Sequence, residues 1–237
     1  MTKISALKED QWRFFRSEIM EIEYSLIQFE SIDLKTSQGS KLRGFFANQY
    51  RDMEIVHNHH GDRFIYSYPK IQYKVIHNHP LVCGIGEGVN IALQITFDTD
   101  NLLIDDKEWA AIQKSMKKEN RKFGIVDDYI EYEFLTPWIA LNQKNAPQYY
   151  KSNRIEQESM LKRILIGNIL SMSKGLGYTV NEKIFTWINL KEKKIYFKGM
   201  EMKGFIGNLK TNFIIPDYLG IGKLVSRGFG TIKVKER

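Results

Sequence analysis

One order of predicted strands and helices occurs twice along the chain, and this order limits the folds that the chain can adopt. In the first occurrence, apolar residues alternate at period two over residues 20–35, which predicts a strand. Helical spacing of apolar residues predicts helices over residues 41–54 and 87–97. Between these helices, runs of aromatic and β-branched residues predict two more strands, 63–76 and 80–85. The first unit thus follows the order β-α-β-β-α.

The second unit begins with an alternating strand at residues 129–136 and continues with the clearest helix of the chain, 155–173. Only strand-like runs follow, at residues 184–190, 194–200, 203–215 and 229–235. Both units suit helices packed on one face of an antiparallel sheet. The sequence therefore predicts an α+β protein built from tandem ferredoxin-like domains, which have the RRM-like βαββαβ order.

Two further helices are expected outside this repeated order. Residues 5–19 place their apolar side chains roughly on one side, which predicts a short helix ahead of the first strand. Residues 106–118 show similar spacing, with an aspartate as the expected N-cap. The expected organisation has three parts: an N-terminal helical extension at 1–19, an N-terminal domain at 20–125 and a C-terminal domain at 126–237.

The positive charge of the chain is concentrated near its C-terminus. The formal net charge is +7, from 35 Lys and Arg against 28 Asp and Glu. Residues 174–237 contain 13 basic and 5 acidic side chains, a net charge of +8, whereas residues 1–173 have a net charge of −1. A local surplus of this kind is typical of a surface that binds a polyanion such as nucleic acid. A lysine-rich solvated surface is the alternative.

Composition also argues against other classes of protein. The single cysteine rules out an intramolecular disulfide and a thiolate zinc cluster, and it fits a cytoplasmic protein. No stretch approaches the roughly 18 apolar residues of a membrane span, so no membrane partner is expected. The N-terminal segment is charged throughout, unlike a signal peptide. With 43% apolar residues, the chain can bury a hydrophobic core.

A glycine-rich segment near the C-terminus is the first candidate site. Residues 220–230 read GIGKLVSRGFG, with two cations placed between the glycines. Glycines let a backbone approach a ligand closely, and their N–H groups can point at phosphates. We therefore expect contacts with an RNA or DNA backbone, the alternative being a mobile turn between two strands. The residues expected to bind RNA are Gly220, Gly222, Lys223, Arg227, Gly228, Phe229 and Gly230.

A cluster of histidines is the second candidate site. Two histidines near one phosphodiester can act as base and acid, because imidazole gains and loses protons near neutral pH. One removes the proton of the 2′-OH, and the other protonates the leaving 5′ oxygen. Tyr66 lies on the adjacent predicted strand, and three nearby cations can stabilise the extra phosphorane charge, namely Lys41, Arg43 and Lys70. All five histidines of the chain belong to this cluster: His57, His59, His60, His77 and His79.

The histidine cluster has two alternative interpretations. The His-x-His pairs at 57/59 and 77/79 would place two imidazoles on one strand face, as in a metal site, and Asp52 or Asp62 would complete the ligands. In the other alternative, the histidines only cap loops. The leading hypothesis needs no metal and no cofactor.

Three segments of the chain match one known family. The first is the glycine-rich segment, preceded by GFIGNLKTNF at residues 204–213. The second is FLTPWIALN at residues 134–142. The third is KLRGFF at residues 41–46, followed by His57-Asn58-His59 and by YSYPKIQYKV at residues 66–75. Over about residues 20–237, these segments resemble the CRISPR-associated repeat-RNA endoribonucleases of the RAMP superfamily. The third segment, which contains His57-Asn58-His59, resembles the type I-B variety.

This resemblance implies a fold, a chemistry and site residues. Its fold is two ferredoxin-like domains, and its chemistry is metal-independent cleavage of precursor CRISPR RNA within the repeat, for antiviral defence. Attack by the 2′-OH leaves 2′,3′-cyclic phosphate and 5′-OH ends. His57 and His59 match the catalytic pair of the type I-B variety, and Tyr66 matches the tyrosine that follows them. Lys41 and His60 are the candidates for catalytic support.

The implied partner is CRISPR repeat RNA, and the resemblance leaves open subunits of a CRISPR effector complex and a homodimer. The main alternative function is a non-catalytic RNA-binding RAMP subunit of such a complex. Paired histidines favour the enzyme, because a protein that only binds RNA has no need of them. Activity in excess EDTA would distinguish this enzyme from a metalloenzyme with histidine and carboxylate ligands.

Overall fold

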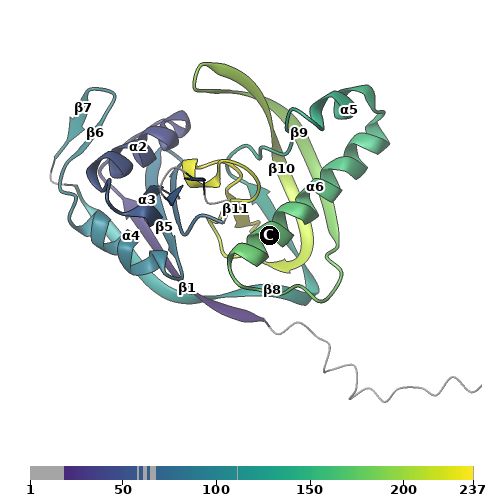
Figure 1. Ribbon diagram of the computed structural model, residues 1–237, viewed down its shortest axis with the longest axis horizontal. Helices are drawn as coiled ribbons and strands as arrows, with labels where there is room; N and C mark the ends of the chain where they lie inside the picture. Colours follow the sequence, from purple (N-terminus) through teal and green to yellow (C-terminus); the bar gives the residue numbers. More distant parts are fainter. Residues whose placement is uncertain (1–18, 58, 61–62, 65–67, 111, 237) are drawn as a thin grey trace, which may run out of the picture.

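A computed structural model describes residues 19–57, 59–60, 63–64, 68–110 and 112–236 of the chain (Figure 1). The helix predicted at residues 5–19 lies, apart from its last residue, outside this described part. The elements as far as β8 are β1 (Met20–Phe29), η2 (Thr36–Gln38), α2 (Gly39–Gln49), α3 (Glu54–His57), β2 (His59–His60), β3 (Arg63–Phe64), β4 (Ile71–Ile76), β5 (His79–Ile85), α4 (Gly88–Phe97), β6 (Leu102–Ile104), β7 (Lys107–Trp109) and β8 (Lys114–Phe134). The later elements are α5 (Ala146–Lys151), α6 (Arg154–Gly175), β9 (Thr186–Phe197), β10 (Met200–Ile214), η3 (Val225–Arg227) and β11 (Ile232–Val234).

One antiparallel sheet runs through both halves of the chain. Its strands lie in the order β4-β5-β1-β8-β10-β9, and β11 also pairs with β8. The 21-residue strand β8 joins the halves, because its first part pairs with β1 and its last part pairs with β10 and β11. Gly124 lies where the partner changes, and its φ of +138° is a conformation that favours glycine. The long strand curves beneath both groups of helices (Figure 1).

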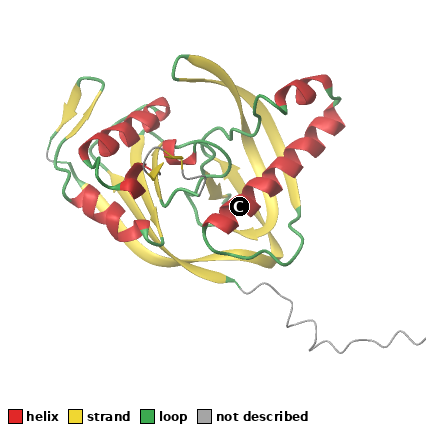
Figure 2. Cartoon of the chain, viewed as in Figure 1, coloured by secondary structure: helices red, strands yellow, loops and turns green. Residues whose placement is uncertain are grey.

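Helices α2 and α4 cover one face of the N-terminal half of the sheet (Figure 2). Between these layers lies a closed apolar core, in which the rings of Phe46 and Tyr73 stack with centroids 5.4 Å apart. Side chains of a strand alternate between its faces. Gln72 and Lys74 of β4 therefore point away from α2, yet both are fully buried. Their burial shows that another part of the chain covers this second face.

Helix α6 packs against the C-terminal half of the sheet and begins at a capping box. The Asn153 side chain accepts a hydrogen bond from the N–H of Glu156, whose carboxylate accepts one from the N–H of Asn153. Trp138 is fully buried in the second apolar core, and its indole N–H donates to Asn168 Oδ1 of α6 at 3.0 Å. None of the helices described is both long and apolar enough to cross a membrane.

The helix predicted over residues 106–118 is wrong. This segment belongs to the β6–β7 hairpin and to the start of β8. Asp105 and Asp106, with φ of 53° and 61°, form the turn of that hairpin instead of capping a helix. The first part of β8 pairs with all of β1, from Met20 to Phe29. This long pairing overrides the helical spacing of the apolar residues, because strand preference depends on cross-strand partners.

Other predictions hold with changed boundaries. The helices predicted at residues 87–97 and 155–173 are confirmed as α4 and α6, and the strand predicted at 80–85 is confirmed as β5. The run at 194–200 is not a separate strand, because it contains the turn at Lys198 that joins β9 to β10. The α+β class with antiparallel pairing is confirmed. Six more predicted strands are shorter or longer than expected, namely β1, β4, β8, β9, β10 and β11.

Candidate functional site

The glycine-rich segment 220–230, called here the glycine loop, is held between the two halves of the chain. Its short helix η3 contacts both β4 and α2. From the N-terminal half, Tyr68 Oη donates to the carbonyl of Gly220 at 2.8 Å, and Gln72 Oε1 accepts from the N–H of Gly220 at 3.1 Å. From the C-terminal half, the carbonyl of Pro137 accepts from the N–H of Gly230 at 2.9 Å. The glycine loop therefore covers the second face of β4.

A buried lysine lies under the glycine loop. Lys74 is fully buried, and its Nζ donates to Gln72 Oε1 at 2.9 Å, the same oxygen that accepts from Gly220. Burial lowers the pKa of Lys74 to about 8. A Cβ placed on Gly228 would lie 3.3 Å from Lys74 Cα, so the glycine loop rests directly on this strand. Neither Gln72 nor Lys74 was identified as a site residue by sequence reasoning.

The glycines shape the loop more than they expose its backbone. Gly220, Gly228 and Gly230 are buried. Their N–H groups donate to Gln72, to the Val225 carbonyl and to the Pro137 carbonyl, respectively. The expectation that glycine N–H groups are free for phosphates is therefore wrong at these three positions. Their contact with RNA stays a prediction, and the accessible part of the loop includes Lys223, Ser226, Arg227 and Phe229.

The two cations of the loop have different surroundings. Lys223 is exposed, its Nζ donates to the Leu141 carbonyl at 3.1 Å, and partial burial of the ammonium lowers its pKa. Arg227 lies with its guanidinium carbon 5.4 Å from the ring centroid of Phe197. The Phe197 ring also contacts Phe229 edge to face, with centroids 5.7 Å apart. Phe197, at the end of the β9–β10 hairpin, thus packs against both Arg227 and Phe229 of the glycine loop.

A second arginine, from the N-terminal half, lies near Arg227. Arg43 of α2 is half-buried, and its pKa is lowered first by burial and then by the positive charge of Arg227. The two guanidinium groups, which come from distant parts of the sequence, are therefore close enough for their like charges to act on each other, as expected where α2 contacts η3. The sequence indicates Arg43 as a cation near the histidines, but it carries no signal that Arg43 of α2 meets Arg227.

The segment that contains His57, His59, His60 and Tyr66, called here the histidine block, begins beside helix α2. Helix α2 contacts α3, which ends at His57, and it also contacts η3 of the glycine loop. In β2, His59 and His60 pair in backbone register with Phe64 and Arg63 of β3. The side chains of His57, His59 and His60, and all of Tyr66, lie outside the described part of the structure. The backbone alone places the block next to α2.

The other two histidines belong to a different feature. His77 and Asn78, with φ of 48° and 70°, form the tight turn between β4 and β5, and His79 begins β5. Both histidines are exposed. Among the residues whose side chains are described, no three His, Cys, Asp or Glu groups lie close enough to hold a metal ion. This finding does not cover His57 and His59, because their side chains lie outside the described part of the structure.

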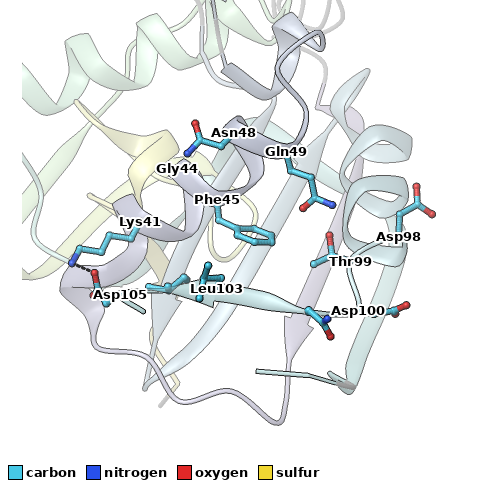
Figure 3. A pocket seen from close by; sticks show the side chains of 12 residues that line it. Lys41, Gly44, Phe45, Asn48, Gln49, Asp98, Thr99, Asp100, Leu103 and Asp105 are labelled. Carbon is cyan, nitrogen blue, oxygen red and sulfur yellow. Dashed lines mark hydrogen bonds and ion pairs between the residues drawn. The ribbon is translucent and has the colours of Figure 1, made fainter. Parts of the chain in front are cut away.

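Lys41 lies on the opposite side of α2 from Arg43, because side chains two positions apart in a helix point in directions that differ by about 200°. Its Nζ forms an ion pair with Asp105 (Figure 3). Asp105 also accepts a hydrogen bond from Gln38. These two bonds, with the Lys41 bond first, lower the pKa of the Asp105 carboxyl. The pair borders an open cleft of about 800 Å³ between α2 and residues 98–105. Catalytic support by Lys41 stays a prediction.

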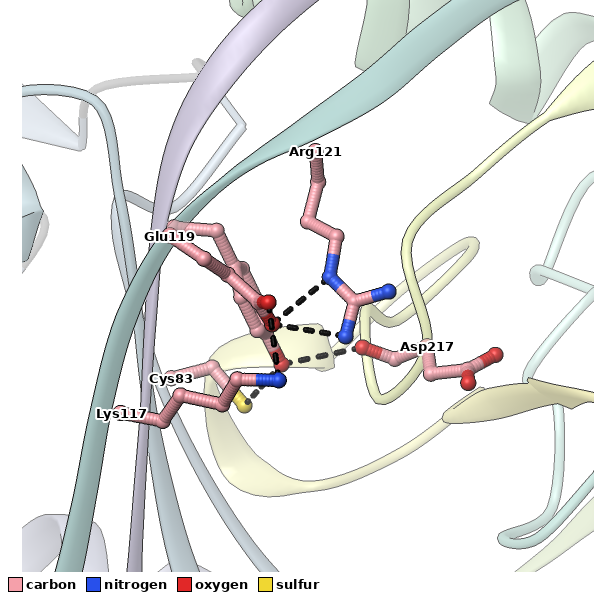
Figure 4. Close-up of polar contacts among 6 residues, drawn as sticks. Cys83, Lys117, Glu119, Arg121 and Asp217 are labelled. Atoms are coloured by element: carbon pink, nitrogen blue, oxygen red, sulfur yellow. Dashed lines mark hydrogen bonds and ion pairs between the residues drawn. The ribbon is translucent and has the colours of Figure 1, made fainter.

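A polar cluster around Tyr24 ties β1 to the segment ahead of the glycine loop (Figure 4). Tyr24 Oη donates to the carbonyl of Asp217 at 3.0 Å, and it also contacts Cys83 Sγ at 3.6 Å. Nearby on β8, Lys117 and Arg121 both form ion pairs with Glu119, at 2.9 and 2.6 Å. Glu119 therefore neutralises part of the charge of the two cations beside it.

Several solved structures share this fold. A protein described as a RAMP protein that binds different RNA substrates is 13% identical, covers 92% of this chain with 100% of its own, and has a TM-score of 0.53. A structure described as Cas6b is 48% identical, with a TM-score of 0.88 over 91% of this chain and 100% of that chain. The fold is that of the Cas6 and RAMP proteins, so the prediction of tandem ferredoxin-like domains is confirmed.

The family itself follows from two family models and from further relatives. The Cas6b N-terminal domain model matches residues 20–122, and the Cas6b C-terminal domain model matches residues 124–235. The chain belongs to the Cas6b family, so the resemblance to RAMP-type CRISPR proteins is confirmed. A crystal structure of a CRISPR RNA processing endoribonuclease Cas6b is 43% identical over 91% of this chain and 100% of that chain, with a TM-score of 0.76. An uncharacterized protein of Methanocaldococcus jannaschii is 39% identical over 145 residues, which are 60% of this chain and 99% of that protein.

Proposed function

We propose that this protein is a metal-independent endoribonuclease that cleaves precursor CRISPR RNA within the repeat. The observation that carries the proposal is the position of α2, which contacts the helix that ends at His57 and also contacts the glycine loop. The relative described as a CRISPR RNA processing endoribonuclease supports the substrate class. In the proposed domain organisation, residues 20–125 supply the histidines and residues 126–237 supply the glycine loop.

The proposed chemistry divides the work between these two parts. Arg43 and Arg227 hold the phosphate at the cleavage position and stabilise the extra negative charge of the phosphorane. His57 and His59 act as base and acid: one takes the 2′-OH proton, and the other gives a proton to the 5′ oxygen as the P–O bond breaks. Tyr66 orients one of these groups. The products are a 2′,3′-cyclic phosphate and a 5′-OH end.

A cleavage assay in excess EDTA tests the function. Repeat RNA should be cut once, within the repeat, at a rate that EDTA leaves unchanged. The same RNA with one 2′-deoxy nucleotide at the cut position should bind with nearly the same affinity but should not be cleaved, because the nucleophile is missing. Loss of activity in EDTA that a divalent metal restores would support the metalloenzyme alternative. Tight binding without any cleavage would support a non-catalytic RAMP subunit.

Replacing both cations of the glycine loop should weaken RNA binding of any sequence. For Lys223→Ala combined with Arg227→Ala, the slope of log affinity against log salt should fall by about 1.4, because each phosphate contact contributes about 0.7 for single strands. The measurement is a salt series of binding isotherms. As a matched control, Lys162 and Lys235, which already pair with carboxylates, should be replaced together and should leave the slope nearly unchanged. A normal slope in the loop variant would contradict the proposed contact.

Further partners remain predictions. Structures described as Cas6 product complexes share this fold at 10–13% identity, which supports an RNA ligand only through the fold. The family resemblance leaves open subunits of a CRISPR effector complex and a homodimer, and the single cysteine fits a cytoplasmic location.

A further inference from the structure

The outer face of the C-terminal half of the sheet exposes a group of aromatic side chains. Tyr129 of β8, Trp187 of β9 and Phe185 just ahead of β9 expose 46%, 45% and 41% of their surface. We call these three residues the aromatic patch. Leaving this much ring surface in water is unfavourable, and contiguous patches of this kind commonly mark a binding surface. Figure 1 labels β8 and β9, the strands to which Tyr129 and Trp187 belong.

Strand register shows that the three side chains share one face. Trp187 lies directly opposite Lys210 of β10, and Lys210 lies opposite Glu131, two residues beyond Tyr129. The rings of Trp187 and Tyr129 touch edge to face, with centroids 4.6 Å apart. Exposure alternates from residue 184 to residue 190, so Phe185 is exposed on the same side as Trp187.

The opposite face of the same strands packs into the core that contains α6 and the glycine loop. Tyr132 of β8 and Leu209 of β10, which are register partners, are buried in that core. Ile169 of α6 and Val225 of the glycine loop belong to the same cluster. The sheet therefore separates the aromatic patch from the glycine loop, and the patch has no part in the proposed cleavage chemistry.

Lysines accompany the exposed rings. Lys210 Nζ lies 5.8 Å from the ring centroid of Tyr129, and Lys183 Nζ lies 5.1 Å from that of Phe185. Both lysines belong to the part of the chain with a net charge of +8, residues 174–237. Glu131, the register partner of Lys210, is itself paired with Lys235 at 2.9 Å. The patch thus combines aromatic faces with positive charge.

We propose that the aromatic patch binds a single-stranded RNA segment, with nucleobases stacked on Tyr129 and Trp187 and with lysines beside the phosphates. This proposal deepens the proposed function and rests on it, since it concerns the RNA on either side of the cut. Every base has an aromatic face, and stacking on exposed rings is how many proteins hold single strands. A protein partner is the weaker candidate, because the cores of protein interfaces are depleted of lysine.

Short homopolymers test the patch without the repeat. The probes are 12-nucleotide strands of oligoadenylate and oligouridylate, and the measurement is the affinity of each at low salt. Trp187→Ala and Tyr129→Ala should each weaken oligoadenylate binding about tenfold, and oligouridylate binding by less, because purines stack more strongly. Trp187→Phe keeps an aromatic face and should stay within about threefold of the unchanged protein.

Tyr196 supplies the matched control, because it is 72% exposed and its hydroxyl donates to Glu201 on the β9–β10 hairpin. Tyr196→Ala should leave oligoadenylate affinity unchanged. At saturating repeat RNA, both patch variants should cleave at the normal rate, so that failure of the patch is distinguishable from failure of the proposed nuclease. Unchanged oligoadenylate affinity in both alanine variants would overturn the proposal. Unchanged RNA affinity together with altered self-association in sedimentation would also overturn it, in favour of a protein-binding surface.

Discussion

Replacement of both His57 and His59 by alanine is expected to slow cleavage of repeat RNA about 10²- to 10⁴-fold, the usual range for a positioned acid or base. RNA affinity should change little, because the cations proposed to bind phosphate are on α2 and the glycine loop. If the two histidines act as one unit, the double variant should be little slower than the more damaged single variant. Single-turnover rates at saturating protein measure this effect separately from binding.

The pH dependence of the same rate provides a second measurement. In the proposed mechanism one histidine is neutral and the other protonated, so the rate should pass through a maximum and fall on both sides. His79→Ala is the matched control, because this exposed histidine begins β5 beyond the β4–β5 turn and should leave the rate unchanged. Undiminished cleavage by the double variant would mean that the reaction uses other residues.

Gly230→Ala is expected to destabilise the protein by on the order of 3 kcal/mol or more. Gly230 has a φ of +63°, and a Cβ at this position would lie 2.0 Å from the Ile221 carbonyl oxygen. The surrounding backbone cannot move away easily, because the Ile221 N–H donates to the Gly230 carbonyl at 2.8 Å and the Gly230 N–H donates to Pro137 at 2.9 Å. Urea unfolding, followed by circular dichroism, measures the loss.

A glycine in open space is the control for this prediction. Gly167 lies inside α6, and nothing lies within 4 Å of the Cβ that alanine would add. Gly167→Ala should therefore stabilise the protein, by up to about 1 kcal/mol, because alanine has the higher helix propensity. If Gly230→Ala proved as stable as Gly167→Ala, the tight packing of the glycine loop would not be needed for stability.

Local sequence patterns predicted most elements correctly where all the signals for an element lie within its own segment of the chain. Helix α6 has its capping box, its apolar spacing and its terminal glycine within one segment of sequence. Residues 106–118 failed for the opposite reason: their apolar spacing is compatible with a helix, but β7 pairs with β6, and the residues from Lys114 on pair with β1. The pairing with β1 joins residues about 90 positions apart, which no local window contains.

Sequence alone determined the α+β class and the order of strands and helices that occurs twice along the chain. It also determined the basic C-terminal part and the two segments that hold the candidate site residues. These features depend on residue type and spacing over short distances, where periodicity is informative. Tertiary structure decided how the glycine loop is used. Its buried glycines, its contact with Gln72 148 residues away and the meeting of Arg227 with Arg43 all arise because the loop packs on the second face of β4. Only the folded chain brings these distant residues together, since packing between the two halves sets their positions.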